Sequence, residues 1–79
     1  MKVEIYTKDD CAYCQQAKQL FDSKGWTYTE HHITDANHGI MLEDLAKRMN
    51  MIPRSVPQIF IDSQHIGGYT QLQEWLRNK

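Results

Sequence analysis

The chain has 79 residues, of which 41% are hydrophobic and 24% are charged, and its formal net charge is −1. This length leaves room for one small domain, and we expect residues 1–79 to form it. The near-neutral charge and the scattered Lys and Arg argue against nucleic acid as a partner. Because Lys2 and Glu4 interrupt the first apolar run, we expect no signal peptide or membrane-spanning segment there, and we predict a cytoplasmic protein.

The first part of the chain predicts a strand, a helix and a second strand. Residues 2–6 carry alternating β-branched and aromatic side chains, which is typical of a strand. Residues 12–24 place apolar side chains at helical spacing, and Gly25 follows as a helix stop. Residues 26–33 are again rich in β-branched and aromatic side chains. A strand, helix and strand in this order indicate a parallel βαβ unit.

The second part predicts a helix, a hairpin and a last helix. The helix covers residues 38–50, after the candidate N-caps Thr34, Asp35 and Asn37. Its expected buried face comprises Met41 or Leu42, Leu45, Ala46 and Met49. Residues 57–61 and 64–66 are close enough to form an antiparallel hairpin, and residues 69–79 form the last helix, in which Trp75 is a packing residue. The order β-α-β-α-β-β-α predicts a thioredoxin-like α/β fold, with a four-stranded mixed sheet flanked by helices.

Both cysteines, Cys11 and Cys14, belong to one Cys-x-x-Cys motif at the start of the first predicted helix. A helix N-terminus favours a thiolate, because its unpaired N–H groups and the helix dipole stabilise negative charge. We therefore predict that Cys11 is the nucleophile, with a pKa below the ordinary value of about 8.5. Cys14, one turn later and more buried, is predicted to be the resolving thiol. Lys8 supports the thiolate, whereas Asp9 and Asp10 oppose it.

Two other uses of the cysteine pair have to be weighed. Inert core cysteines are one, and a structural zinc site is the other, since four histidines (His31, His32, His38 and His65) are available as further ligands. A second Cys-x-x-Cys motif is absent, and neighbouring histidines in a strand point to opposite faces of the sheet. We therefore expect no metal site and place the histidines on the surface.

Four segments, taken together, resemble the glutaredoxin family. They are Ile5–Lys8, Cys11-Ala12-Tyr13-Cys14, Ser55–Ile61, and His65–Gly68 followed by an aromatic-led helix. The resemblance covers nearly the whole chain and is closest to the short dithiol glutaredoxins of bacteria and their phages. It implies a thiol–disulfide oxidoreductase that uses glutathione as its co-substrate and reduces protein disulfides and glutathione mixed disulfides. It also implies a monomer, with ribonucleotide reductase as a client.

The resemblance further implies a glutathione site made of Lys8, Tyr13, Val56, Pro57, Gly68, Tyr69 and Thr70, with Arg54 as an additional candidate. Pro57 is expected to follow a cis peptide bond, which leaves the backbone of Val56 free to pair with the cysteinyl part of glutathione. The helix N-terminus after Gly68 can receive the γ-glutamyl carboxylate. Lys8 can meet the glycine carboxylate, and Tyr13 can form a wall. In the alternative interpretation Pro57 simply begins a strand, and Gly67-Gly68 form an ordinary turn from a strand into a helix.

Three positions depart from the family pattern. Ala12 stands where proline is common, which should loosen the first turn of the helix. In some relatives a small residue there accompanies a [2Fe–2S] cluster, and this is a minor, not favoured alternative. Thr70 stands where many relatives have aspartate, which predicts weaker glutathione affinity because a charged contact is lost. Ser55 replaces threonine, with little expected effect.

A redoxin reduced directly by thioredoxin reductase is a second enzymatic alternative. Such relatives usually differ at the position of Tyr13, and they carry a Trp-Ser-Gly-Phe-type segment where this chain has Gly67-Gly68-Tyr69-Thr70. The sequence therefore favours glutathione as the reductant.

Overall fold

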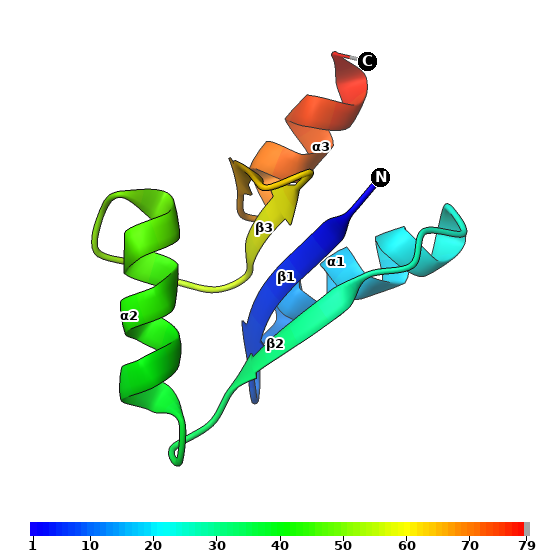
Figure 1. Cartoon of the computed structure of the whole chain (residues 1–79). Coiled ribbons are helices and arrows are strands. Elements are labelled where there is room, and N and C mark those ends of the chain that lie inside the picture. Colours follow the sequence, from blue (N-terminus) through cyan, green and yellow to red (C-terminus); the bar gives the residue numbers. More distant parts are fainter. Residues whose placement is uncertain (79) are drawn as a thin grey trace.

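A computed structural model describes residues 1–78 of the chain (Figure 1). Its elements are β1 (Val3–Lys8), α1 (Ala12–Ser23), β2 (Thr29–Ile33), α2 (His38–Met49), β3 (Gln58–Ile61), β4 (Gln64–Gly67) and α3 (Tyr69–Arg77). The predicted order β-α-β-α-β-β-α is confirmed. Lys79, the last residue of the predicted final helix, lies outside the described residues.

The four strands form one mixed sheet in the order β2-β1-β3-β4 (Figure 1). β1 and β2 are parallel, as predicted for the βαβ unit. β3 is antiparallel both to β1 and to β4, so the predicted hairpin is also confirmed. β4 lies at one edge of the sheet, and the turn that leads from it into α3 is close to the start of α1.

Each face of the sheet has its own hydrophobic core. The first core lies between the sheet and the helices α1 and α3, and its buried residues are Val3, Ile5, Ala17, Phe21, Ile59, Ile61 and Leu72. Trp75 packs against this core, as expected. On the other face, Leu45 of α2 packs with Tyr6 and Phe60, and Met41 and Met49 complete the contact. The predicted packing role of both methionines is therefore confirmed.

Two strand boundaries differ from the sequence prediction. β1 continues to Lys8 instead of ending at Tyr6, because residues 7 and 8 pair with His32 and Ile33 of β2. β2 begins only at Thr29, because the Trp26 N–H donates to the Phe21 carbonyl (2.9 Å) and ties this segment to the end of α1. The aromatic side chains of Trp26 and Tyr28 therefore pack against the core but do not belong to β2.

The ends of α2 set the direction of the chain on both sides of the helix. Asn37 is the N-cap, but its side chain does not cap α2 and instead accepts a hydrogen bond from the Thr34 N–H (2.7 Å). At the other end Asn50 adopts a left-handed conformation (φ 58°), and its N–H donates to the Ala46 carbonyl. The Met51 N–H donates to the same carbonyl (3.3 Å). This helix stop fixes where Met51 lies.

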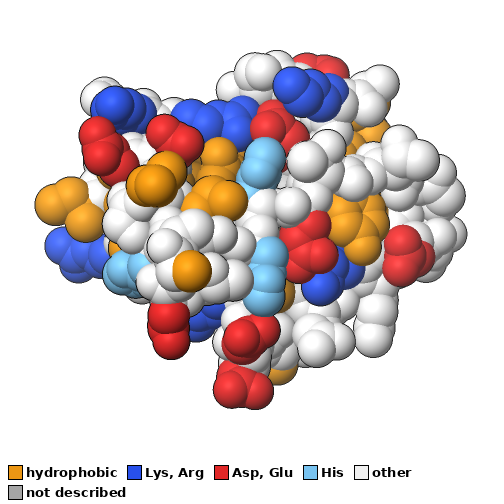
Figure 2. All heavy atoms as spheres, turned by 60° about the horizontal axis from the view of Figure 1, so that its bottom comes forward, with side chains coloured by type: hydrophobic (Ala, Val, Ile, Leu, Met, Phe, Trp, Pro, Cys, Tyr) orange, Lys and Arg blue, Asp and Glu red, His pale blue; other side chains and the backbone are white. Residues whose placement is uncertain are grey.

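Residues 1–78 contain no helix that is long and apolar enough to cross a membrane. Figure 2 shows acidic, basic and hydrophobic side chains interspersed over one face of the molecule.

Candidate active site

Cys11 and Cys14 are joined by a disulfide at the start of α1, with their Cα atoms 5.2 Å apart. Cys11 is the N-cap of the helix and is half-buried, whereas Cys14 is only 1% exposed. A substrate can therefore approach the sulfur of Cys11 more readily than that of Cys14. This difference agrees with the predicted division between an attacking and a resolving thiol.

The backbone around Cys11 provides both a donor and an acceptor. The Cys14 N–H donates to Cys11 Sγ (3.1 Å), and the same Sγ lies 3.6 Å from the Val56 carbonyl oxygen. The first turn of α1 contains no acidic residue. Asp9, which we expected to oppose a thiolate, faces His32, with 3.0 Å between Oδ1 and Nε2. The helix N-terminus thus contributes a favourable potential for negative charge at Cys11.

A groove of about 190 Å³ lies beside the disulfide. It is lined by Tyr13, Ser55, Val56, Pro57, Gly68, Tyr69, Thr70 and Gln71. The rings of Tyr13 and Tyr69 are stacked, with their centroids 6.1 Å apart. The Val56–Pro57 peptide bond is cis, as the resemblance implied. Six of the seven residues predicted to bind glutathione therefore come together from three distant segments; their role in binding stays a prediction.

Lys8, the seventh predicted residue, does not line this groove. It lies in an adjoining hollow of about 160 Å³, on which Arg54 also borders. Ser55 and Val56 line both spaces. The two basic residues are exposed, and they are separated from the tyrosine walls by the Ser55–Val56 segment.

The sequence analysis missed Gln71, which lines the groove. Its side-chain oxygen Oε1 accepts a hydrogen bond from the Gly68 N–H (3.0 Å) at the start of α3. The signal was present in the sequence, since a residue with a side-chain acceptor three positions after an N-cap is typical of a capping box. Gln71 therefore holds the turn that forms one side of the groove.

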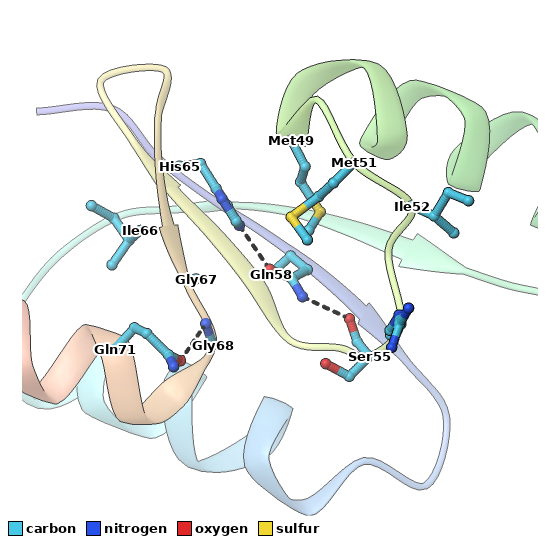
Figure 3. Close-up of a pocket in the computed structure, with 11 residues that line it drawn as sticks. Met49, Met51, Ile52, Ser55, Gln58, His65, Ile66, Gly67, Gly68 and Gln71 are labelled. Atoms are coloured by element: carbon cyan, nitrogen blue, oxygen red, sulfur yellow. Dashed lines mark hydrogen bonds between the residues drawn. The ribbon is translucent and has the colours of Figure 1, made fainter.

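A second missed feature is the chain of hydrogen bonds from His65 through Gln58 to Ser55 (Figure 3). Gln58 Nε2 donates to the Ser55 carbonyl oxygen (2.9 Å), and Gln58 Oε1 lies 2.8 Å from His65 Nε2. Because the Ser55 carbonyl oxygen can only accept a hydrogen bond, the Gln58 side-chain amide must turn its NH2 group toward it. His65 Nε2 must therefore carry a proton and donate to Gln58. The buried Gln58 thus braces the segment that precedes Val56.

The expectation that all four histidines are surface residues is wrong for two of them. His65 is half-buried against β3, and burial lowers its pKa. His31 is half-buried because its ring packs 4.5 Å from that of Tyr6 and its Nε2 lies 3.1 Å from Glu4 Oε1. Within residues 1–78 no group of three or more His, Cys, Asp or Glu side chains is arranged to hold a metal ion.

The buried carboxylate of Glu4 is paired on the α2 face of the sheet, away from the groove. Both terminal guanidinium nitrogens of Arg48 donate to it at 2.9 Å, and one of them also donates to Tyr6 Oη (3.1 Å). The hydrogen bonds from Arg48 lower the pKa of Glu4 to about 2, although burial opposes the shift. The Arg48 guanidinium also lies 4.0 Å from the centre of the Phe60 ring. This pair joins α2 to the sheet and has no place in the redox chemistry.

A cysteine pair at the start of the first helix of a thioredoxin-like fold defines a thiol–disulfide redox protein. The family model for glutaredoxins matches residues 3–66. Glutaredoxin 3 of Escherichia coli is 53% identical over 74 residues, covering 89% of this chain and 80% of the relative. Glutaredoxin 1 of Escherichia coli K12 is 34% identical over 80 residues, covering 98% of this chain and 94% of the relative. The chain belongs to the glutaredoxin family.

Solved structures agree with this assignment. Glutaredoxin 1 from Francisella tularensis, in complex with cacodylate, superposes with a TM-score of 0.79 at 36% identity, covering 99% of this chain and 98% of that one. A buckwheat glutaredoxin–glutathione complex gives a TM-score of 0.82 at 28% identity, covering 96% of this chain and 68% of that one. Glutaredoxins are thiol–disulfide oxidoreductases, and the Cys11–Cys14 pair gives this chain the same chemistry.

Proposed function

We propose that this protein is a glutathione-dependent dithiol glutaredoxin that reduces protein disulfides and glutathione mixed disulfides. The observation that carries the proposal is the groove beside Cys11, in which six residues expected to contact glutathione line one space. The family uses glutathione as a co-substrate, and the buckwheat relative is described as a complex with it.

The reaction proceeds by two exchanges. The Cys11 thiolate attacks one sulfur of the client disulfide, and the other client sulfur leaves as a thiolate and takes up a proton. The Cys14 thiolate then attacks Cys11 Sγ, closes the Cys11–Cys14 disulfide and releases the second client thiol. Two electrons and two protons thus pass to the client. Two glutathione molecules restore the dithiol and leave as glutathione disulfide.

Glutathione is proposed to lie along the groove in an extended form. Its cysteinyl backbone pairs with Val56, beside the Cys11 sulfur, and Pro57 follows at the end of the same segment. Tyr13 and Tyr69 form the walls, with their rings 6.1 Å apart. The α3 N-terminus receives the γ-glutamyl carboxylate through the backbone N–H groups of its first turn.

The glycine carboxylate is proposed to reach Lys8 across the Ser55–Val56 segment, which borders both the groove and the adjoining hollow. The remaining proposals, a monomeric state and ribonucleotide reductase as a client, rest on family resemblance alone, whereas the cytoplasmic location is carried over from the sequence prediction. The iron–sulfur alternative rests only on Ala12, which opens α1, and forms no part of the proposal.

A coupled assay with glutathione, glutathione reductase and NADPH tests the proposal, with the mixed disulfide of glutathione and 2-mercaptoethanol as substrate. We expect turnover in the wild-type protein and none in Cys11→Ser. Cys14→Ser should retain turnover of this mixed disulfide, because glutathione can replace the resolving thiol, but should lose reduction of a protein disulfide. Normal turnover in Cys11→Ser would refute the assignment.

A further inference from the structure

A second pocket of about 380 Å³ opens between the end of α2 and β4, on the same side of the sheet as α2 (Figure 3). We call it the side pocket. Figure 3 shows the side chains of Met49 and Met51 pointing from the end of α2 toward Gln58 and His65, which form its floor. Nothing in the redox chemistry described above uses this pocket.

The side pocket adjoins the groove beside Cys11. Ser55, Gly68 and Gln71 line both spaces. Ser55 immediately precedes Val56, whose carbonyl oxygen lies 3.6 Å from Cys11 Sγ. A polypeptide whose cysteine reacts with Cys11 can therefore extend past Gly68 and place a neighbouring residue in the side pocket.

The lining of the side pocket indicates which side chain it takes. Met51 is 58% exposed although it is large and apolar, and the helix stop at Asn50 holds it at the rim. The polar floor is already paired, because Gln58 bonds to both Ser55 and His65. The described lining residues include Arg54 but no carboxylate. Such a pocket favours an apolar side chain and disfavours a basic one.

We propose that the side pocket is a specificity site for disulfide-containing client proteins, and that it binds an apolar side chain a few residues from the client's reactive cysteine. Glutathione bound in the groove has no such side chain, so the side pocket distinguishes protein substrates from glutathione. This inference rests on the part of the proposed function in which Cys11 attacks a protein disulfide. It does not depend on which thiol restores the dithiol.

The test uses synthetic peptides that contain an internal Cys-Gly-Gly-Cys disulfide with three residues on each side. In the reference peptide all six flanking residues are serine, and in six further peptides one leucine moves through these positions. The protein is reduced with dithiothreitol, desalted and mixed with excess peptide. Acid quenching and chromatography then give the second-order rate constant of a single turnover, without glutathione.

At one or two of the six positions we expect leucine to speed the reaction about tenfold over serine, as one apolar side chain in a hydrophobic pocket typically does. Lysine at the same position should give no gain. Met51→Asp should reduce the leucine-to-serine ratio to about twofold or less, since it places a carboxylate at the rim. Ile40→Asp is the matched control: Ile40 is also apolar and is 71% exposed, but it lines neither the groove nor the side pocket. It should keep the wild-type ratio.

Three results would overturn the inference: no leucine preference at any position, an unchanged ratio in Met51→Asp, or an equal loss in Ile40→Asp. A protein that turns over the glutathione mixed disulfide but shows no leucine preference refutes the side pocket alone. A leucine preference in a protein that shows no turnover with glutathione supports the side pocket and refutes glutathione dependence.

Discussion

At the scale of single residues, the predicted reactivity of Cys11 follows from its position as the N-cap of α1. The Cys14 N–H that donates to Cys11 Sγ at 3.1 Å would also stabilise a thiolate at that sulfur, together with the helix N-terminus. We therefore predict a pKa below about 8.5 for Cys11 in the reduced protein. The pH dependence of alkylation by iodoacetamide in a Cys14→Ser variant measures it. A pKa at or above the ordinary value contradicts the prediction, and a variant with both Cys11→Ser and Cys14→Ser provides the blank.

Thr70 should weaken glutathione binding relative to relatives with aspartate at this position. Thr70 is exposed in the first turn of α3 and lines the groove. Thr70→Asp offers a carboxylate to the amino group of glutathione, and exposed ion pairs of this kind are worth about 0.2–1 kcal/mol. The KM for glutathione should therefore fall by up to about fivefold. Thr70→Asn, which adds a polar group without charge, should leave the KM near the wild-type value; equal effects of both variants would contradict the charge argument.

The side-chain contacts that could not be predicted form only in the folded chain. Glu4 and Arg48 are 44 positions apart. Gln58 is close in sequence to its partners Ser55 and His65, but a strand pattern does not show which groups its side-chain amide meets. By contrast, the cysteine roles and the groove residues lie in short local motifs. Gln71 is the exception, because its position three residues after the N-cap Gly68 is a local capping-box signal.

At the scale of elements, the turn from β4 into α3 requires glycine at position 67. Gly67 has φ +118°, and a Cβ there would lie 2.9 Å from the Gln71 Cβ and Cγ atoms. Gly67→Ala should therefore destabilise the protein by about 1–3 kcal/mol, the usual size of such backbone strain. It should also slow turnover, because Gln71 lines the groove.

Gly39→Ala is the control for this substitution. Gly39 lies in α2, and a Cβ there would meet nothing within 4 Å. Because Gly39 lies in the first turn of that helix, alanine should stabilise by no more than about 0.5–1 kcal/mol, the gain typical of a helix interior. Urea unfolding of both variants measures the two changes. A Gly67→Ala protein as stable as wild type would contradict the requirement for glycine.

The order of the elements was predictable because hydrophobic periodicity is local. The two strand boundaries were not, because they depend on pairing and packing between segments. Residues 7 and 8 have the polar character of a turn, and only their pairing with β2 makes them part of β1. Trp26 looks like a strand residue until its N–H bonds to the end of α1.

At the scale of the whole molecule, the two faces of the sheet are held differently. The α1 and α3 face is closed by an extended apolar core, whereas the α2 face has a small apolar cluster beside the Glu4–Arg48 pair. α2 ends at the side pocket, and the segment after it leads to Ser55–Val56. By holding α2 against the sheet, the Glu4–Arg48 pair therefore helps to fix the positions of the residues that line the groove and the side pocket.

Glu4 should make the protein sensitive to acid. The pKa of Glu4 is about 2 in the folded protein against the ordinary value of 4.5, because Arg48 donates two hydrogen bonds to the carboxylate. A lowered pKa in the folded state stabilises the protein fully above pH 4.5, and this stabilisation is lost as the pH falls from 4.5 toward 2. One pKa unit corresponds to about 1.4 kcal/mol, so the loss amounts to about 3–4 kcal/mol at most.

Glu4→Gln keeps the shape of the side chain but cannot titrate. The difference in unfolding free energy between the two proteins, measured with urea at several pH values from 7 to 2, should be constant down to about pH 5 and then shrink. A difference that stays constant down to pH 2 would show that Glu4 is not held as a buried carboxylate by Arg48.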